Sequence, residues 1–119
     1  MENGIITLNN IRLYAHHGCL KEEAMIGCNY IVDVKIYIDY SVAAKTDDLS
    51  KTVDYCEVFE IVKREMKIRS KLIEHAAGRI ANALKKEIKK IEKVKVRLTK
   101  IAPPVNGEVG SVSVVSTKY

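Results

Sequence analysis

Residues 30–39, which read YIVDVKIYID, decide the fold of this chain. Apolar side chains recur at every second position, at Tyr30, Val32, Val34, Ile36 and Ile38. The positions between them are mainly polar and include Asp33, Lys35, Tyr37 and Asp39. A period of two with one apolar face indicates a strand that is buried on one side, as in an antiparallel sheet.

The residues before this strand predict another strand and a loop. We expect a strand from Ile5 to Ala15, in which the apolar alternation changes phase at Asn9-Asn10. Such a change of phase is what a β-bulge produces. A loop that contains two glycines then runs from His16 to Asn29.

The residues after it predict two helices. Asp54 begins the first, because Glu57 follows three residues later in the pattern of a capping box. Apolar residues then recur at helical spacing, at Val58, Phe59, Val62 and Met66. The second helix starts near Leu72 and carries an apolar stripe of Ile73, Ala77, Ile80, Leu84 and Ile88. Stripes of this kind face a core.

Two further strands complete the pattern. Residues 94–100 alternate between apolar and polar side chains, and Pro103-Pro104 ends that strand because proline lacks the ladder N–H. A last strand runs from Ser111 to Thr117. The order ββααββ predicts an α+β fold, with both helices on one face of a four-stranded antiparallel sheet. The other face carries Lys35, Tyr37, Lys95, Arg97 and Thr99, and we expect it to line an oligomer interior.

Length and composition predict one domain spanning residues 1–119. Apolar residues make up 47% and charged residues 29%, which is the balance of a soluble globular protein. The N-terminal residues show no targeting pattern, and no apolar run approaches the length of a membrane span, so we expect a cytoplasmic protein without membrane partners. The net charge of +5 is compatible with anionic partners, but acids are interspersed in the basic stretch 85–93, and we expect no nucleic-acid partner.

Histidines and cysteines give no sign of a metal site. The histidines His16, His17 and His75 do not have the spacing that places two ligands on one face. The three cysteines form no CxxC pair, and reduced thiols are expected for them. We therefore predict a protein without bound metal.

Lys100 departs from the pattern of its strand. Its position places it with Val96 and Leu98 on the apolar side. Desolvation there would lower the pKa of the lysine and let it act as a base near neutral pH. The alternative is a lysine whose stem is buried while its ammonium group reaches solvent at the strand end.

Four other residues are candidates for chemistry, each with a plainer alternative. Glu74, at the start of the second helix, can accept two parallel N–H bonds from an amidine-like edge, or merely compensate the helix dipole. Tyr55 can stack on a flat ring, or be a partly buried tyrosine. Glu23 can hold a water or a substrate hydroxyl, or be an exposed loop acid. His17 can be a ligand or base, or a hydrogen-bonded structural histidine.

Four segments match a known family in order and spacing. They are IRLYAHHG at 11–18 followed by Glu23 and Ile26-Gly27, TDD at 46–48 followed by TVDY at 52–55 and Val58, LIEHAA at 72–77, and VRLTK at 96–100 followed by Pro103-Pro104. On these segments the chain resembles the dihydroneopterin aldolase family over nearly its whole length. The resemblance implies the tunnelling fold (T-fold), in which four subunits join their sheets into a barrel and two rings commonly stack as an octamer. It also implies active sites between neighbouring subunits.

The resemblance assigns the pterin-binding residues. Glu74 would hold the amino-pyrimidinone edge of the pterin, helped by the backbone of Ile73. Tyr55 of the neighbouring subunit would contact the pterin as a catalytic and binding residue, with the backbone of Val53 close by.

The resemblance also implies the reaction. Lys100 would be the principal acid/base group, acting with an ordered water, and Glu23 would position the trihydroxypropyl chain of the substrate. The activity would be retro-aldol cleavage of 7,8-dihydroneopterin in folate biosynthesis, with possible epimerase activity. The dihydropterin C=N bond would accept electrons, so neither a metal, a Schiff base nor a cofactor is needed.

Two residues depart from the pattern of the family, and other functions remain as alternatives. Ile101 follows Lys100 where many relatives have proline, and Asp54 lies at a variable position, which leaves fine specificity open. An epimerase of dihydroneopterin triphosphate on the same fold is the nearest alternative, and a non-catalytic module for pterin, nucleotide or RNA is another. A pyruvoyl-tetrahydropterin synthase is disfavoured because the histidines that its zinc needs are missing.

Overall fold

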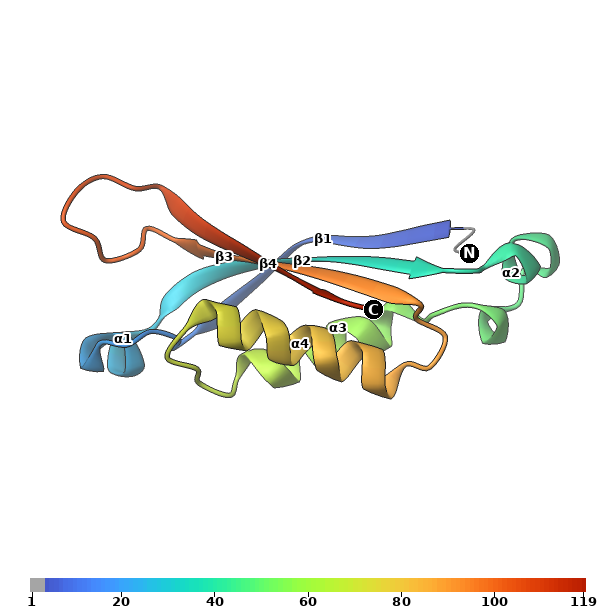
Figure 1. Ribbon diagram of the computed structural model, residues 1–119, viewed down its shortest axis with the longest axis horizontal. Coiled ribbons are helices and arrows are strands. Elements are labelled where there is room, and N and C mark those ends of the chain that lie inside the picture. Colours follow the sequence, from blue (N-terminus) through green and yellow to red (C-terminus); the bar gives the residue numbers. More distant parts are fainter. Residues whose placement is uncertain (1–3) are drawn as a thin grey trace.

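Four strands form one antiparallel sheet in the order of the chain. The computed structural model describes residues 4–119, with β1 Gly4–Ala15, β2 Cys28–Ile38, β3 Lys93–Ile101 and β4 Ser111–Lys118 (Figure 1). The sheet order is β1-β2-β3-β4, and every neighbouring pair is antiparallel. The predicted sheet is confirmed, and its two edges are the long strand β1 and the strand β4.

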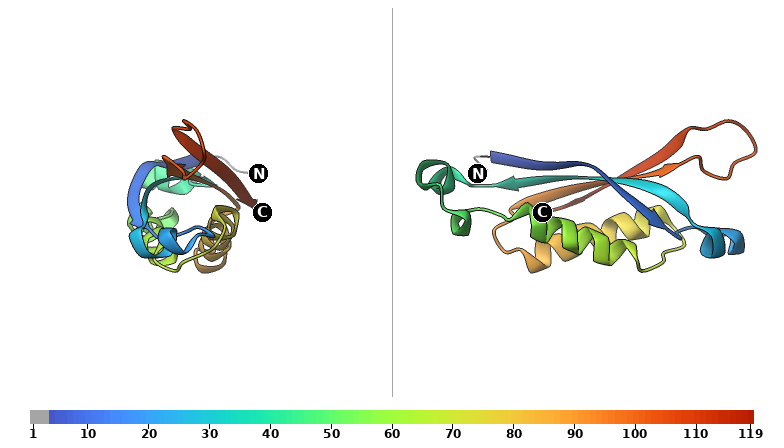
Figure 2. Two further views of the ribbon diagram at one scale, coloured as in Figure 1. Left: turned by 90° about the vertical axis from the view of Figure 1, so that its left-hand side faces the viewer. Right: turned by 180° about the vertical axis from the view of Figure 1, so that it is seen from behind.

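Two helices cover one face of this sheet. α3 Tyr55–Met66 and α4 Ile73–Glu87 run along the same side, and the opposite side is left open (Figures 1 and 2). Three shorter helices lie in the connections, namely α1 Lys21–Ile26, α2 Ser41–Thr46 and the 3₁₀ turn η1 Leu49–Lys51. None of the helices within residues 4–119 combines the length and apolar character needed to span a lipid bilayer.

The predicted loop 16–29 is more ordered than expected. It contains α1, and β2 already begins at Cys28, two residues before the predicted strand. α1 has only six residues, too few for an apolar period to be recognised. Gly27, with a φ of +81°, ends α1 and lets the chain turn directly into β2.

The predicted bulge in β1 is confirmed. The pairing of β1 with β2 shifts register between Leu8 and Ile11, and Asn10 has a φ of +58°. The backbone N–H of Asn10 donates to Oδ1 of Asp33 on β2 at 2.8 Å, which satisfies a donor that the ladder leaves unpaired. The bulge returns the apolar residues of β1 to the covered face on both sides of it.

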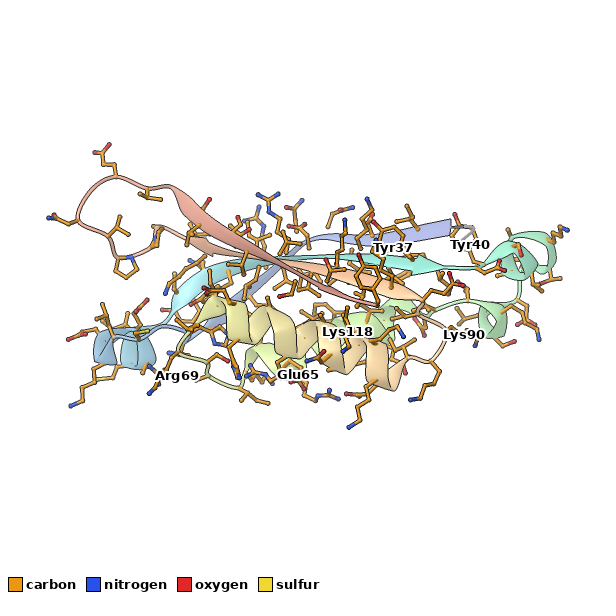
Figure 3. The ribbon with its side chains drawn as sticks, in the orientation of Figure 1. Tyr37, Tyr40, Glu65, Arg69, Lys90 and Lys118 are labelled. Carbon is orange, nitrogen blue, oxygen red and sulfur yellow. The ribbon has the colours of Figure 1, made fainter. Side chains whose placement is uncertain are left out.

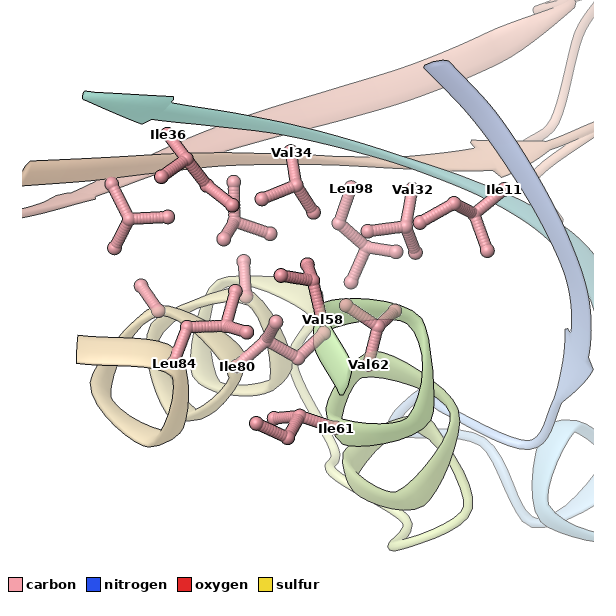
Figure 4. Close-up of a cluster of buried hydrophobic side chains, with 14 of the residues drawn as sticks. Ile11, Val32, Val34, Ile36, Val58, Ile61, Val62, Ile80, Leu84 and Leu98 are labelled. Atoms are coloured by element: carbon pink, nitrogen blue, oxygen red, sulfur yellow. The ribbon is translucent and has the colours of Figure 1, made fainter. Parts of the chain in front are cut away.

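The core lies between the sheet and the two helices (Figure 4). Every apolar residue on the covered face of β2, from Tyr30 to Ile38, is at most 1% exposed. Val58 and Val62 of α3 and Ile80 and Leu84 of α4 pack against this face. The prediction that Phe59 belongs to the apolar stripe of α3 was wrong. Phe59 is 37% exposed, and Ile61 is buried instead. Phe59 lies about 100° around the helix from Val58, which rotates it away from the sheet.

Asp54 begins α3, as predicted. Its side chain accepts the backbone N–H of Cys56 at 2.9 Å, which caps the helix. The return bond of a capping box, in which the backbone N–H of Asp54 donates to the Glu57 carboxylate, is absent from the hydrogen bonds of residues 4–119. Glu57 remains in the first turn, where a carboxylate favours the helix dipole.

Candidate active site

Lys100 is buried at the end of β3 and held by two oxygen atoms. Its residue is 6% exposed, and its Nζ forms an ion pair with the Glu23 carboxylate of α1. The same Nζ donates to the backbone carbonyl of His17 at 3.1 Å. The ammonium group therefore points into the protein, and the alternative of a lysine that reaches solvent does not describe it.

Glu23 reaches Lys100 because of a tight turn before α1. One carboxylate oxygen accepts the backbone N–H of Leu20 at 3.2 Å, while the other faces Lys100. Gly18 has a φ of +144°, and a Cβ at this position would run into the Glu23 carboxylate. Gly18 thus supplies both the backbone conformation and the space that the ion pair needs.

The two charges stabilise each other, and both groups are ionised at neutral pH. Burial acts to lower the pKa of Lys100, but the hydrogen bond that Lys100 donates to Glu23 and the nearby Tyr30 raise the pKa above its ordinary value. Burial likewise acts to raise the pKa of Glu23, yet hydrogen bonds from Lys100 and the Leu20 backbone lower it overall. Desolvation alone would lower the pKa of Lys100, and the sequence pattern shows this burial but not the carboxylate that reverses the direction.

His17 connects the lysine to the helical layer. Its carbonyl accepts the Tyr30 hydroxyl at 2.9 Å in addition to Lys100. Its ring Nδ1 accepts the backbone N–H of Ser70, between α3 and α4, at 2.9 Å. Sequence reasoning counted Tyr30 only as a core residue and did not consider Ser70. The β2–β3 register, which pairs Tyr30 with Lys100, is the signal that relates the tyrosine to the site.

The His17 ring is neutral in the folded protein. Burial, together with the positive charges of Arg79 and Lys100, lowers its pKa from 6.5 to about 4. Because Nδ1 accepts a hydrogen bond, the ring proton resides on Nε2, which is buried and has no partner within residues 4–119. These contacts favour the interpretation of His17 as a hydrogen-bonded structural histidine over its interpretation as a base.

We expect the free energy of unfolding to fall as the pH is lowered from 7.5 to 5. In this range the unfolded chain binds more protons than the folded one, because the pKa of His17 is lowered on folding. The loss attributable to His17 is about 2 kcal/mol. Urea denaturation at both pH values should show that His17→Gln removes most of this loss, whereas replacing the exposed His16 by glutamine keeps it. An unchanged pH dependence in His17→Gln would assign the effect to other groups.

Ile73 and Glu74 lie at the same end of the molecule as Lys100. Ile73 is the first residue of α4 and is half-buried against the core, while Glu74 is exposed in the first turn. The loop before α4 is fastened to the turn at His17, because Gly18 donates its backbone N–H to the carbonyl of Ser70 at 3.0 Å. This hydrogen bond joins the loop that precedes Glu74 to the turn whose His17 carbonyl binds Lys100.

Val53 and Tyr55 lie at the opposite end. Tyr55 begins α3, which is 12 residues or about 18 Å long and runs toward the Lys100 end. Figure 3 marks the two ends: Arg69, which donates to the His16 carbonyl, lies near α1, and Lys90, which shares a pocket with Val53, lies at the far end. Tyr55 is 64% exposed, whereas Val53 is buried. One chain does not bring Tyr55 to its own Lys100.

Each end carries an open pocket that is small for a ligand. Lys100 and Glu23 line one of about 220 Å³, together with Leu20, Ile26 and Pro104. Val53 and Asp54 line another of about 260 Å³. Sites for small molecules usually measure about 300–1,000 Å³, so each pocket has the size of part of a site. Within residues 4–119, no three His, Cys, Asp or Glu side chains are grouped to hold a metal ion.

What the residues near Lys100 can do is transfer protons. The pair offers one ammonium group and one carboxylate beside a pocket, and a first-turn carboxylate that can accept N–H groups lies on the neighbouring helix. Such a set can orient a substrate and move protons on it.

Comparison with known proteins gives a consistent result along the chain. Residues 6–117 match the family model for dihydroneopterin aldolase. A dihydroneopterin aldolase of Staphylococcus epidermidis is 41% identical over 113 residues, which cover 94% of this chain and 93% of that protein.

Solved structures show the same fold at lower identity. Escherichia coli dihydroneopterin aldolase in complex with neopterin superposes with a TM-score of 0.89 at 21% identity, covering 98% of this chain and 99% of that one. A dihydroneopterin aldolase of Burkholderia thailendensis bound to guanine gives a TM-score of 0.77 at 19% identity, covering 97% and 89%. These likenesses confirm the tunnelling fold that the sequence predicted.

Proposed function

The chain belongs to the dihydroneopterin aldolase family, and on that premise we propose that it cleaves 7,8-dihydroneopterin in folate biosynthesis. The products are 6-hydroxymethyl-7,8-dihydropterin and glycolaldehyde. The observation that carries the proposal is the ion pair between the buried Lys100 and the partly buried Glu23, beside an open pocket. This pair supports an acid/base role for Lys100, and Glu74 in the first turn of α4 offers a carboxylate for substrate recognition.

Recognition of the pterin is assigned to Glu74. Its carboxylate accepts two N–H groups from the amino-pyrimidinone edge, and the backbone of Ile73 adds a further contact. Neopterin, bound in the Escherichia coli relative, and guanine, bound in the Burkholderia relative, both carry this edge. Glu74 is exposed in the first turn of α4, where its carboxylate can accept a ligand.

Proton transfer is assigned to Lys100. Its raised pKa makes it an ammonium group at rest, so it acts first as the acid, toward the ring nitrogen of the dihydropterin C=N bond. The neutral amine then accepts the proton of the side-chain hydroxyl through a water held by Glu23. Breaking the carbon–carbon bond releases glycolaldehyde and leaves an enamine, whose carbon takes up a proton as the ring nitrogen gives one back. No electrons are gained or lost overall.

Neither a metal nor a Schiff base is part of this mechanism. A Schiff base requires a neutral amine as nucleophile, and the ion pair with Glu23 favours the protonated form of Lys100 in the resting site. The pterin ring itself accepts the electrons of the broken bond.

The complete site is formed between subunits of a homo-oligomer, with Tyr55 and the Val53 backbone supplied by a neighbouring chain. Two features support this arrangement. Tyr55 is exposed at the end of the molecule remote from Lys100. The long edge strand β1 and the edge strand β4 carry unpaired backbone groups, and joining them between copies closes sheets into a ring. The family resemblance implies that such a ring is a tetramer, or that two rings stack as an octamer.

A cytosolic location is part of the proposal. The three cysteines are free, two of them exposed, which suits a reducing compartment.

The test is product analysis with 7,8-dihydroneopterin under anaerobic conditions, with a chelator present. We expect glycolaldehyde and the hydroxymethyl product in equal amounts, and no inactivation when borohydride is added during turnover. Epimer alone, or turnover only of the triphosphate, would replace the aldolase by an epimerase. Absence of turnover with either substrate would leave a binding module.

A further inference from the structure

The open face of the sheet carries a pocket that the proposed reaction does not use. Its volume is about 470 Å³, and residues of all four strands line it, among them Asn9, Asp33, Lys35, Lys95 and Arg97. Its charged lining residues lie on the face of the sheet that the helices leave open. Figure 1 shows that both long helices cover the opposite face. Lys100 belongs to the covered face, so the two pockets are separate.

Positive charge is concentrated on this face. The strand register places five cations on it, namely Arg12, Lys35, Lys93, Lys95 and Arg97. Asp33 is the one carboxylate among the paired strand residues of the same face. The excess of four positive charges compares with a net charge of +5 for the whole chain.

Three cations line the pocket, and Asp33 is the one carboxylate among its lining residues. Lys35 and Lys95 lie directly opposite each other in the β2–β3 register, an arrangement that destabilises a sheet. Arg97 lies opposite Asp33, yet Asp33 accepts the Asn10 N–H and no ion pair joins it to Arg97 within residues 4–119. We call Lys35, Lys95 and Arg97 the open-face basic cluster.

In the proposed ring, the open faces of further copies of the chain do not neutralise this cluster. Each copy brings the same excess of cations on this face, so a ring multiplies the positive potential. An anion from solution can supply the compensating charge.

We propose that the open-face basic cluster binds an oligophosphate anion. Opposite residues on antiparallel strands are about 5 Å apart, and two steps along a strand span about 7 Å, so the three cations are spread wider than a single phosphate. A chain of two or three phosphates reaches all three. Lysine and arginine side chains are the usual ligands of phosphate oxygens, and arginine adds bidentate hydrogen bonds.

Calorimetric titration of the full-length protein with tripolyphosphate and with orthophosphate, at matched ionic strength, tests the proposal without any turnover. The variant is Lys95→Met, which removes the charge and keeps the aliphatic stem. The matched control is Lys63→Met, which removes one exposed charge from α3 on the other side of the sheet. Circular dichroism checks that both variants fold.

We expect wild-type protein to bind tripolyphosphate at least about 10-fold more tightly than orthophosphate, as several charge-assisted bonds would give. Lys95→Met should weaken the tripolyphosphate complex about 10-fold or more, and Lys63→Met less than about 2-fold. Equal weakening in both variants would show mere screening of net charge and overturn the site. Absence of binding, or equal affinity for both anions, would overturn it as well.

Discussion

Replacing Lys100 by methionine is expected to lower kcat about 1,000-fold, within the range that a general acid–base group contributes. Affinity for the product 6-hydroxymethyl-7,8-dihydropterin should change less than about 5-fold, because Glu74 holds the pterin edge and Lys100 acts on the side chain. Steady-state assays at saturating substrate measure kcat, and fluorescence titration with the product measures the affinity.

The change also leaves Glu23 without its partner. A partly buried carboxylate that loses its cation destabilises the folded state, so Lys100→Met alone can lower activity through the fold. The double variant Lys100→Met/Glu23→Gln removes this charge and should be as inactive as the single variant while regaining stability. If turnover returned with stability in the double variant, Lys100 would be a structural residue and the proposed acid/base role would be wrong.

Replacing Glu74 by glutamine is expected to have the opposite signature. The amide retains one acceptor oxygen in place of two charged ones, so the affinity for the product should fall about 30-fold or more, from the loss of charge-assisted hydrogen bonds. The kcat at saturating substrate should change less than about 5-fold, because proton transfer is unaffected. Titration calorimetry and steady-state kinetics separate the two quantities.

Glu60→Gln is the matched control for Glu74→Gln. Glu60 is an exposed acid of α3, so its replacement removes the same charge from the helical layer. Its affinity for pterin should equal that of the wild type. A large fall in kcat for Glu74→Gln with unchanged affinity would place Glu74 in the chemistry and refute its role in recognition.

The sheet and the helices could be predicted because their patterns are local. The alternation in β2 and the stripe on α4 each repeat over many residues, so single exceptions such as Phe59 do not hide them. α1 was missed because six residues contain too little of a helical period. The bulge at Asn10 could be predicted because a change of phase is itself a pattern.

The site could be predicted only in part because it depends on distant pairs. Lys100 stood out by its position on an apolar face, but its partner Glu23 lies 77 residues earlier and arrives through the turn at Gly18. The pKa of Lys100 follows from that partner, so burial alone predicted the wrong direction. The separation between Tyr55 and Lys100 becomes visible only in the folded chain. The proposal of a shared site rests on this separation.

The most direct test of the shared site is to mix two inactive variants. Lys100→Met and Tyr55→Phe homo-oligomers are each dissociated, mixed in equal amounts and reassembled, and the aldolase activity is measured. If Lys100 and Tyr55 of one site come from different chains, about a quarter of the sites in a random mixture contain both native residues, and about a quarter of wild-type activity returns. Mixtures that stay as inactive as the separate variants, although exchange is verified by native mass spectrometry, would contradict the account.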